Sequence, residues 1–565
     1  MHSVASRGAS IGWRSARVVL ALLLLNGALT FANVWPTLGV HWRGELSVEL
    51  AALLVALAGG CAHGRRIRRR WLVLASLLVV LLALGRYADV TSPALYGRPV
   101  NLYWDLPHVG EVVGMLARVA SVWQLLALSL AALLVLGVLY LLARWSLGQV
   151  SEAMRLHRAA RTGLGAAAAL LVACFGVQQL SERVPRVPRF SIPVSQTYGV
   201  QVARVLSVLS GSATRGLPPT PPLHSNFKAL HGDDVLLIFV ESYGRSTYDR
   251  PEFRRYLAPV RERLQAAIHD SGRDVVSAFV TSPTFGGTSV LAHLSLLSGT
   301  EVRDMRRYRL LMTQQRPSLV SAFRDADYRT IALMPGNQHP WPEGSFYGFA
   351  HIYDARQLDY RGPPFGWWHI PDQYSLAFLD AKVLQPHPRR PLFVFFPTLS
   401  THMPFRPTPP VQPDWSRMFS ARPYDAAPLQ ASMARTPQWT RLGDSYVGAV
   451  QYFFETFADF LRRRPDEPCV VILLGDHQPA ASVSGEGASW DVPVHVISSR
   501  PAILAALRAQ GFRTGLAPSG VALGDMNQLT QWLLAAFNEP AGPLPAATEA
   551  RPAPLRAPTA IPLAP

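Results

Sequence analysis

The stretch Val235-Leu236-Leu237-Ile238-Phe239-Val240 decides the fold of the larger part of this chain. Six consecutive apolar residues, mostly β-branched or aromatic, are typical of a strand that is buried on both faces. Similar short apolar runs follow at Val275–Val280, Thr330–Met334, Leu392–Phe396, Val470–Leu474 and Val494–Ile497. Helical patterns lie between them, for instance at Thr288–Leu297 and Tyr446–Leu461. This alternation predicts an α/β domain with a mostly parallel sheet, covered by helices on both faces.

Longer apolar runs precede this domain. They cover Val18–Trp35, Leu46–Ala62, Trp71–Tyr87, Val122–Leu142 and Thr162–Leu180. Because about 20 apolar residues cross the hydrocarbon core of a bilayer, these runs predict a membrane domain with five helices. The expected division of the chain is a transmembrane domain at 1–184, a linker at 185–232 with an interfacial helix near Gln201–Leu209, the α/β domain at 233–538, and a disordered Pro- and Ala-rich tail at 539–565.

The positive charge is concentrated in the membrane domain. The whole chain has a formal net charge of +17, and residues 1–184 contain 17 Arg, no Lys and 7 acidic residues. The Arg residues gather before the first run, between the second and third, and between the fourth and fifth. By the positive-inside rule these segments are cytoplasmic, so five spans would place the α/β domain outside the membrane. No basic stretch is interleaved with aromatic residues, so nucleic acid is not an expected partner.

Polar residues follow several of the predicted strands directly. Glu241 ends the first strand, Gly286-Gly287-Thr288-Ser289 follows the second, His402 follows Leu392–Phe396, and Asp476-His477 follows Val470–Leu474. Each of these residues alone would fit an ordinary turn or helix cap. Ligands of open α/β sheets bind at the carboxyl ends of the strands, so their shared position predicts one site. Carboxylate and imidazole groups there suit Mn, Zn or Mg.

The combination resembles a known group of enzymes. Glu241, Thr288, Asp476 and His477 occur in the order and spacing of the motifs of the alkaline phosphatase superfamily. Five spans followed by a sulfatase-like domain resemble the lipoteichoic acid synthases and phosphoglycerol transferases of that superfamily, from the first span to about Phe537. The resemblance implies that these four residues hold one divalent metal ion, with Mn as the first choice and Zn or Mg as alternatives. It also implies that Thr288 is the nucleophile.

The same resemblance suggests residues that contact the substrate. His402 would contact the phosphoryl oxygens in the transition state. Trp367 or Trp368, together with Asp372, would lie near the glycerol group. Arg245 is a further substrate-binding candidate, without an assigned role.

The function that the resemblance implies is transfer of phosphoglycerol from an anionic lipid, phosphatidylglycerol, to a glycan or a glycerophosphate polymer. The reaction would pass through a phosphothreonine-type covalent intermediate, in a bacterial inner membrane and with the catalytic domain in the periplasm. Alternatives are a phosphoethanolamine transferase, a phosphodiesterase or sulfatase-type hydrolase, and a non-catalytic lipid-binding regulator. The nucleophile segment lacks the Cys-X-Pro-X-Arg pattern of sulfatases, and the outer domain has a single cysteine, Cys469, whereas phosphoethanolamine transferases usually carry several disulfides.

Overall fold

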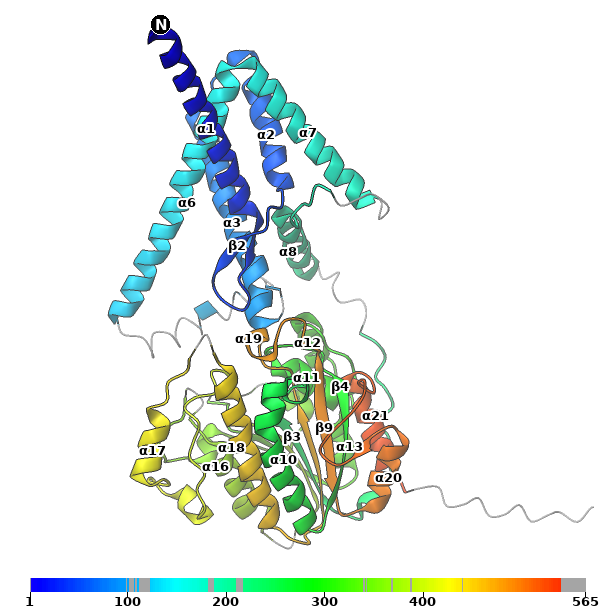
Figure 1. Cartoon of the computed structure of the whole chain (residues 1–565). Helices are drawn as coiled ribbons and strands as arrows, with labels where there is room; N and C mark the ends of the chain where they lie inside the picture. The colour runs from blue at the N-terminus through cyan, green and yellow to red at the C-terminus, as the bar shows by residue number, and fades with distance from the viewer. Residues whose placement is uncertain are drawn as a thin grey trace, which may run out of the picture.

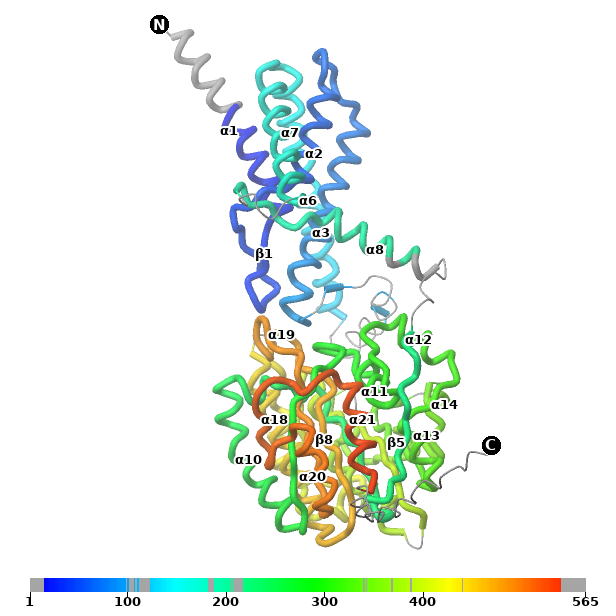
Figure 2. The backbone as a smooth tube through the Cα atoms, turned by 90° about the vertical axis from the view of Figure 1, so that its right-hand side faces the viewer, coloured from blue at the N-terminus to red at the C-terminus, as the bar shows by residue number. Residues whose placement is uncertain are grey.

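The computed structural model describes residues 2–97, 99–100, 106, 109–110, 122–180, 187–209, 217–338, 341, 343–366, 369–386, 389–438 and 441–539. Within them the chain forms a helical N-terminal part and an α/β domain, which lie one above the other in Figures 1 and 2. The predicted tail lies outside the described residues apart from Glu539.

Each predicted apolar run of the N-terminal part forms a helix. The helices are α1 (His2–Thr30), α2 (Val48–Gly60), α3 (Arg69–Tyr96), α6 (Val122–Leu156) and α7 (Arg158–Leu180). Helices α3, α6 and α7 are long and apolar enough to cross a membrane, and α2 and the Ser15–Thr30 part of α1 are shorter apolar helices. The helices therefore agree with a membrane domain, in which three of the helices that the structure describes meet both the length and the apolar character of a full span.

The apolar side chains of these helices divide between an interior and an outer surface. Leu25 of α1, Leu54 of α2 and Leu147 of α6 are buried in one cluster, whereas Leu130 and Leu133 of α6 are exposed. An apolar outer surface of this kind suits contact with lipid chains. The connections include a short hairpin of β1 (Phe31–Asn33) and β2 (Val40–Trp42), and the 3₁₀ turn η1 (Ala62–Gly64).

A further helix, α8 (Val194–Leu209), lies in the segment predicted as a linker and begins before the expected Gln201. The hydroxyl of Tyr198 donates a hydrogen bond to the carbonyl oxygen of Leu81 at 2.8 Å, which ties α8 to α3. Further along the helix, Val202 and Leu206 expose their apolar side chains. Exposed apolar residues beside the membrane helices are what an interfacial helix requires.

The α/β domain is built on an eight-stranded sheet of order β10-β4-β9-β8-β3-β7-β5-β6. The strands are β3 (Asp234–Val240), β4 (Asp274–Thr281), β5 (Arg329–Met334), β6 (His351–Asp354), β7 (Leu392–Pro397), β8 (Cys469–Gly475), β9 (Asp491–Ser498) and β10 (Arg513–Thr514). All six predicted strands are confirmed. The two that were not predicted, β6 and β10, are short edge strands.

The sheet is mostly parallel, as predicted. Strand β3 pairs in parallel with β8 and β7, and β5 pairs in parallel with β7 and β6. Strand β9 lies antiparallel between β8 and β4, so β4 again runs in the direction of β8. The carboxyl ends of β3, β4, β7 and β8 therefore meet at one edge of the sheet.

Alternate residues of the central strand β3 belong to two separate hydrophobic cores, one on each face of the sheet. Leu236 and Ile238 pack under α10 (Pro251–Asp270), α16 (Asp372–Phe378) and α18 (Gly443–Arg462). Leu237 and Phe239 pack on the opposite face, under α11 (Ser289–Ser298), α12 (Met305–Met312), α13 (Leu319–Asp325), α20 (Pro501–Ala509) and α21 (Met526–Ala536). Two covered faces explain why β3 is a continuous apolar run.

The remaining short elements belong to the connections of this domain. They are η4 (Lys228–Leu230), α9 (Ser246–Asp249), α14 (Gly344–Tyr347), α15 (Ala355–Leu358), the π-helical turn η5 (Leu379–Leu384), η6 (Trp415–Phe419), α17 (Ala426–Met433) and α19 (Ala481–Ser484).

Candidate metal centre

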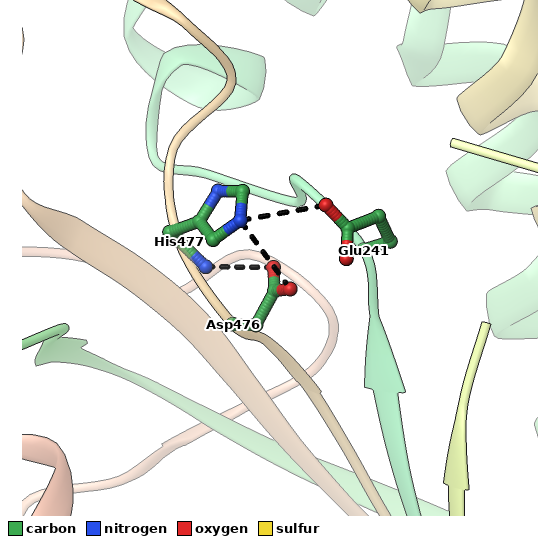
Figure 3. A group of neighbouring side chains, drawn as sticks. All are labelled: Glu241, Asp476 and His477. Carbon is green, nitrogen blue, oxygen red and sulfur yellow. Dashed lines mark hydrogen bonds and ion pairs between the residues drawn. The ribbon is translucent and has the colours of Figure 1, made fainter. Parts of the chain in front are cut away.

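Three of the predicted site residues meet where β3 and β8 end. The two strands are parallel neighbours, with Val240 paired to Gly475, so Glu241 and Asp476-His477 leave the sheet side by side. His477 Nε2 lies 3.4 Å from Glu241 Oε1 and 3.5 Å from Asp476 Oδ2, as Figure 3 shows. One ligand atom of each residue lies within 4.8 Å of the others, a spacing at which all three can bind one metal ion.

The backbone around these residues allows the two strand ends to approach closely. A Cβ at Gly475 would overlap the carbonyl oxygen of Tyr243, so glycine is required there. Ser242 has a positive φ of 57°, and its N–H donates to Asp476 Oδ1 at 2.8 Å. The N–H of His477 donates to the same oxygen at 2.7 Å. Two backbone donors therefore fix the orientation of the Asp476 carboxylate.

The second oxygen of Asp476 shows that a cation fits this site. Asp476 is fully buried, and its Oδ2 has no hydrogen-bond partner among the described residues. Glu241 and His477 are also buried, at 8% and 1% exposure. A buried carboxylate oxygen without a hydrogen bond is unfavourable unless a positive charge lies beside it, as His477 Nε2 does here at 3.5 Å. Two carboxylates and one imidazole make a suitable ligand set for a divalent cation.

The pKa values of the three residues are shifted because two carboxyl groups and one imidazole are buried side by side. Burial and the neighbouring Glu241 carboxylate raise the pKa of Asp476 above its usual range. Burial disfavours the charged form of His477, yet Asp476 and Glu241 outweigh it and raise the pKa of His477 to about 9. Burial likewise opposes ionisation of Glu241, but the charge of His477 lowers its pKa below the usual range. In this arrangement His477 carries the positive charge that a bound cation would otherwise supply.

The predicted nucleophile lies at the start of α11, beside the three ligands. Thr288 precedes the helix with φ 64° and ψ 45°, a left-handed conformation that is rare for a β-branched residue. Its hydroxyl makes no hydrogen bond with the described residues. The hydroxyl that contacts the ligands belongs to Ser289, whose Oγ donates to Glu241 Oε2 at 3.0 Å and lies 3.2 Å from His477 Nε2.

Hydrogen bonds join the loop of Thr288 to the loop of the metal ligands. The N–H of Gly286 donates to the carbonyl oxygen of Gln478 at 3.1 Å. The hydroxyl of Ser282 donates to the carbonyl oxygen of Asp476 at 2.6 Å. The roles of Ser282 and Ser289 were not foreseen from the sequence, because a serine near a strand end is most often a turn or cap residue. Only their contact with the ligand loop distinguishes them.

The predicted phosphoryl contact, His402, follows β7 as expected. It is half-buried, and its Nδ1 lies 2.7 Å from the carbonyl oxygen of Met403. It lies near enough to Glu241 to contribute to the lowering of that pKa. His402 and the metal ligands therefore share one edge of the sheet.

Two of the predicted substrate-binding residues, Asp372 and Arg245, are bound to other groups of the protein in this structure. Asp372 is fully buried, and its carboxylate accepts hydrogen bonds from the N–H groups of Leu399 at 2.8 Å and Ser400 at 3.0 Å. It therefore orders the loop that carries His402, and a contact of Asp372 with the substrate stays a prediction. The guanidinium of Arg245 is bound to Asp249 and Asp491, at 2.9 and 3.0 Å. Trp367 and Trp368 lie outside the described residues.

Residues 234–496 match the sequence model of the family described as Sulfatase. No curated protein matches the chain.

Among solved structures, a lipoteichoic acid synthase, LtaP, from Listeria monocytogenes is similar at 12% identity and a TM-score of 0.35, covering 60% of this chain and 79% of that chain. The phosphoglycerol transferase GacH from Streptococcus pyogenes, in complex with sn-glycerol-1-phosphate, is similar at 10% identity and a TM-score of 0.35, covering 60% and 81%. An alkaline phosphatase superfamily protein from Vibrio parahaemolyticus is similar at 14% identity and a TM-score of 0.32. The match covers 50% of this chain but only 63% of that one, less than two thirds of its length.

Proposed function

Because residues 234–496 form a sulfatase-family domain, we propose that the protein is a membrane-anchored, metal-dependent phosphotransferase. It moves phosphoglycerol from phosphatidylglycerol to a glycan or a glycerophosphate polymer. The observation that carries the proposal is the buried Asp476 Oδ2, which makes no hydrogen bond with the described residues and lies with Glu241 and His477 beside the strained Thr288. A non-catalytic regulator would have no need for such a site.

In this proposal Glu241, Asp476 and His477 hold one divalent ion, and Thr288 completes the set. Mn is our first choice, with Zn and Mg as alternatives. When bound, such an ion lowers the pKa of a hydroxyl group and offsets the negative charge of a phosphodiester.

The reaction has two balanced steps. Thr288 Oγ1 forms a bond to the phosphorus of the lipid headgroup and loses its proton. The bond from phosphorus to diacylglycerol breaks, and the departing oxygen gains a proton. An acceptor hydroxyl then forms the next bond to phosphorus, loses its proton, and displaces Thr288, which regains its hydroxyl hydrogen.

Other groups of the chain bind and orient the reacting phosphate. At the start of α11 the N–H groups of Ser289 and Val290 can attract an anion, whereas the N–H of Leu291 donates to the carbonyl oxygen of Thr288 at 3.0 Å. His402, whose Nδ1 lies 2.7 Å from the carbonyl oxygen of Met403, contacts a phosphoryl oxygen in this proposal. Ser289 holds Glu241 in place by its hydrogen bond. The membrane helices keep the domain close to its lipid donor, on the periplasmic side according to the positive-inside rule.

The test uses the full-length protein in detergent with phosphatidylglycerol and Mn. Thr288→Ala should reduce release of diacylglycerol by about 10³-fold or more, as expected for loss of a nucleophile. Thr313→Ala is the matched control, because it removes the hydroxyl of an exposed threonine at the end of α12 and should retain full release. Undiminished release by Thr288→Ala would overturn the assignment of the nucleophile.

Mass spectrometry of the protein incubated with lipid identifies the transferred group. A glycerophosphate-sized adduct on Thr288 supports the proposal. A phosphoethanolamine-sized adduct would move the protein to the phosphoethanolamine transferases, and free glycerophosphate without an acceptor product would make it a hydrolase. The complete absence of diacylglycerol release and of any adduct would favour a lipid-binding regulator.

A further inference from the structure

A large cavity lies between the membrane domain and the outer domain. Its volume is about 990 Å³, within the range of small-molecule pockets, which often form at domain interfaces. The hairpin β1–β2 and the end of α3 form one wall. Phe285 and residues 485–488 and 490, after α19, form the opposite wall. Both views show the end of α3 directly beside α19 (Figures 1 and 2).

The same loops carry the cavity wall and the candidate metal centre. Phe285 lines the cavity three residues before Thr288. Its ring lies 5.7 Å from that of Trp490, in the loop that follows the metal ligand His477. Because Gly286 is hydrogen-bonded to Gln478, the two loops form one continuous surface between the cavity and the site.

The membrane side of the cavity carries two arginines with different surroundings. Arg86 is 7% exposed, and its Nε donates to the carbonyl oxygen of Phe31 at 2.8 Å, while Nη2 lies 3.8 Å from Glu45. Arg43 is exposed and makes no hydrogen bond or ion pair with any described residue. Arg86 therefore links α3 to Phe31 and Glu45 in the wall of the cavity. The guanidinium of Arg43, in contrast, is available to an anion.

The rest of the lining suits an amphipathic ligand. Trp35 and Trp490 stand at opposite walls, and aromatic rings of this kind favour the boundary between membrane and water. Pro93 and Phe190 add apolar surface. On the outer-domain wall Glu486 is exposed and can accept hydrogen bonds from a polar headgroup.

We propose that this cavity binds the headgroup of the phospholipid donor, with Arg43 facing its phosphodiester. The inference rests on the proposed function and deepens it by naming the place where the lipid is bound. A lipid held there has its phosphate between the membrane and the loop of Thr288, so it reaches the site without leaving the bilayer. The phosphodiester is common to phosphatidylglycerol and phosphatidylethanolamine, and Glu486 can accept hydrogen bonds from the hydroxyls of one or the ammonium of the other.

Binding can be measured apart from turnover in the full-length Thr288→Ala protein. Dihexanoyl-phosphatidylglycerol is titrated into the protein in detergent, and the heat of binding and the fluorescence of tryptophan are recorded. Arg43→Glu should weaken the Kd by about tenfold or more, because it replaces a charge-assisted contact by repulsion. Ala488→Trp, which places a bulky ring in the cavity lining, should weaken it as well. The matched control is Arg189→Ala, an exposed arginine that does not line the cavity and should leave the Kd unchanged.

Parallel titrations identify the source of the phosphate. Tight binding of the phosphatidylglycerol or phosphatidylethanolamine analogue, but not of inorganic phosphate, supports a lipid site. Equal binding of inorganic phosphate, or a Kd that neither Arg43→Glu nor Ala488→Trp changes, overturns the inference.

The inference and the proposed function fail in different ways. Saturable lipid binding that Arg43→Glu weakens, in a protein that never releases diacylglycerol, would retain the cavity site and refute the transferase. Diacylglycerol release with the same KM in wild type and Arg43→Glu would retain the transferase and refute the cavity site.

Discussion

At the residue scale, the two oxygens of Asp476 have different surroundings. Oδ1 accepts two backbone hydrogen bonds, whereas Oδ2 is buried without any. Close by, Ser242 and Thr288 adopt positive φ angles of 57° and 64°. Such conformations cost about 1–3 kcal/mol each and persist where the surrounding structure enforces them. Backbone strain and a carboxylate oxygen without a hydrogen bond thus coincide at the candidate metal centre.

Asp476→Asn tests whether Oδ2 belongs to a metal site. The amide keeps an oxygen for the backbone donors but removes the charge. We expect addition of Mn to raise the Tm of the wild-type protein, because a ligand that binds only the native state stabilises it. In Asp476→Asn this rise should disappear, and metal content measured by mass spectrometry should fall at least about tenfold.

Asp425→Asn is a suitable control, since this carboxylate lies on the surface at the start of α17 and binds Arg417. It should retain both the metal and the rise in Tm. Full metal content in Asp476→Asn would contradict the ligand assignment.

At the element scale, α16 and the loop after β7 depend on each other through Asp372. Its carboxylate accepts the N–H groups of Leu399 and Ser400, and its own N–H donates to the hydroxyl of Ser400 at 3.2 Å. Because His402 lies in the same loop, this connection positions a predicted catalytic side chain. A buried carboxylate held in this way is sensitive to pH.

The expected pH dependence follows from the pKa of Asp372. Burial raises this pKa to about 6, although the N–H groups of Leu399 and Ser400 oppose the rise. Between about pH 4 and 6 the unfolded chain loses the proton while the folded protein keeps it, so stability falls as pH rises. The destabilisation is complete above pH 6 and amounts to roughly 3 kcal/mol, at about 1.4 kcal/mol for each pKa unit.

Asp372→Asn should therefore gain stability relative to wild type as pH increases from 4 to 7, measured as the difference between the two Tm values. The variant also loses one acceptor for a backbone N–H, which lowers its stability by a similar amount at every pH. A Tm difference that stays constant between pH 4 and 7 would refute the raised pKa of Asp372.

At the scale of the whole molecule, the membrane domain contacts the loop that carries Thr288. A Cβ at Gly286 would overlap the carbonyl oxygen of Tyr96 at the end of α3, and a Cβ at Gly97 would overlap the ring of Phe285. Both glycines have positive φ, 67° at Gly286 and 81° at Gly97. The two domains thus approach each other closely, backbone against backbone, beside the candidate site.

Gly286→Ala should displace the loop of Thr288 from α3. We expect kcat for diacylglycerol release to fall at least about tenfold, since small displacements of a catalytic group reduce rates strongly. Gly287→Ala is the matched control: its φ of 141° is also unfavourable for alanine, but no atom lies within 4 Å of its Cβ position. Equal losses in the two variants would show that backbone strain, and not contact with α3, limits the reaction.

Much of this organisation follows from local sequence patterns. The six long strands, the apolar helices and the positions of Glu241, Asp476, His477 and His402 at strand ends could be predicted, because hydrophobic runs and strand termini are local properties. The edge strands β6 and β10 were missed, since two to four residues carry too little pattern.

The sequence by itself determined which residue types stand at the ends of the strands and which segments are apolar enough for a membrane. Only the tertiary structure decided that Asp372 faces backbone N–H groups, that the hydroxyl of Ser289 contacts the ligands, and that α3 reaches the loop of Thr288. These features depend on contacts between segments far apart in the chain. Strand order and close backbone approach set such contacts, and no local pattern encodes them.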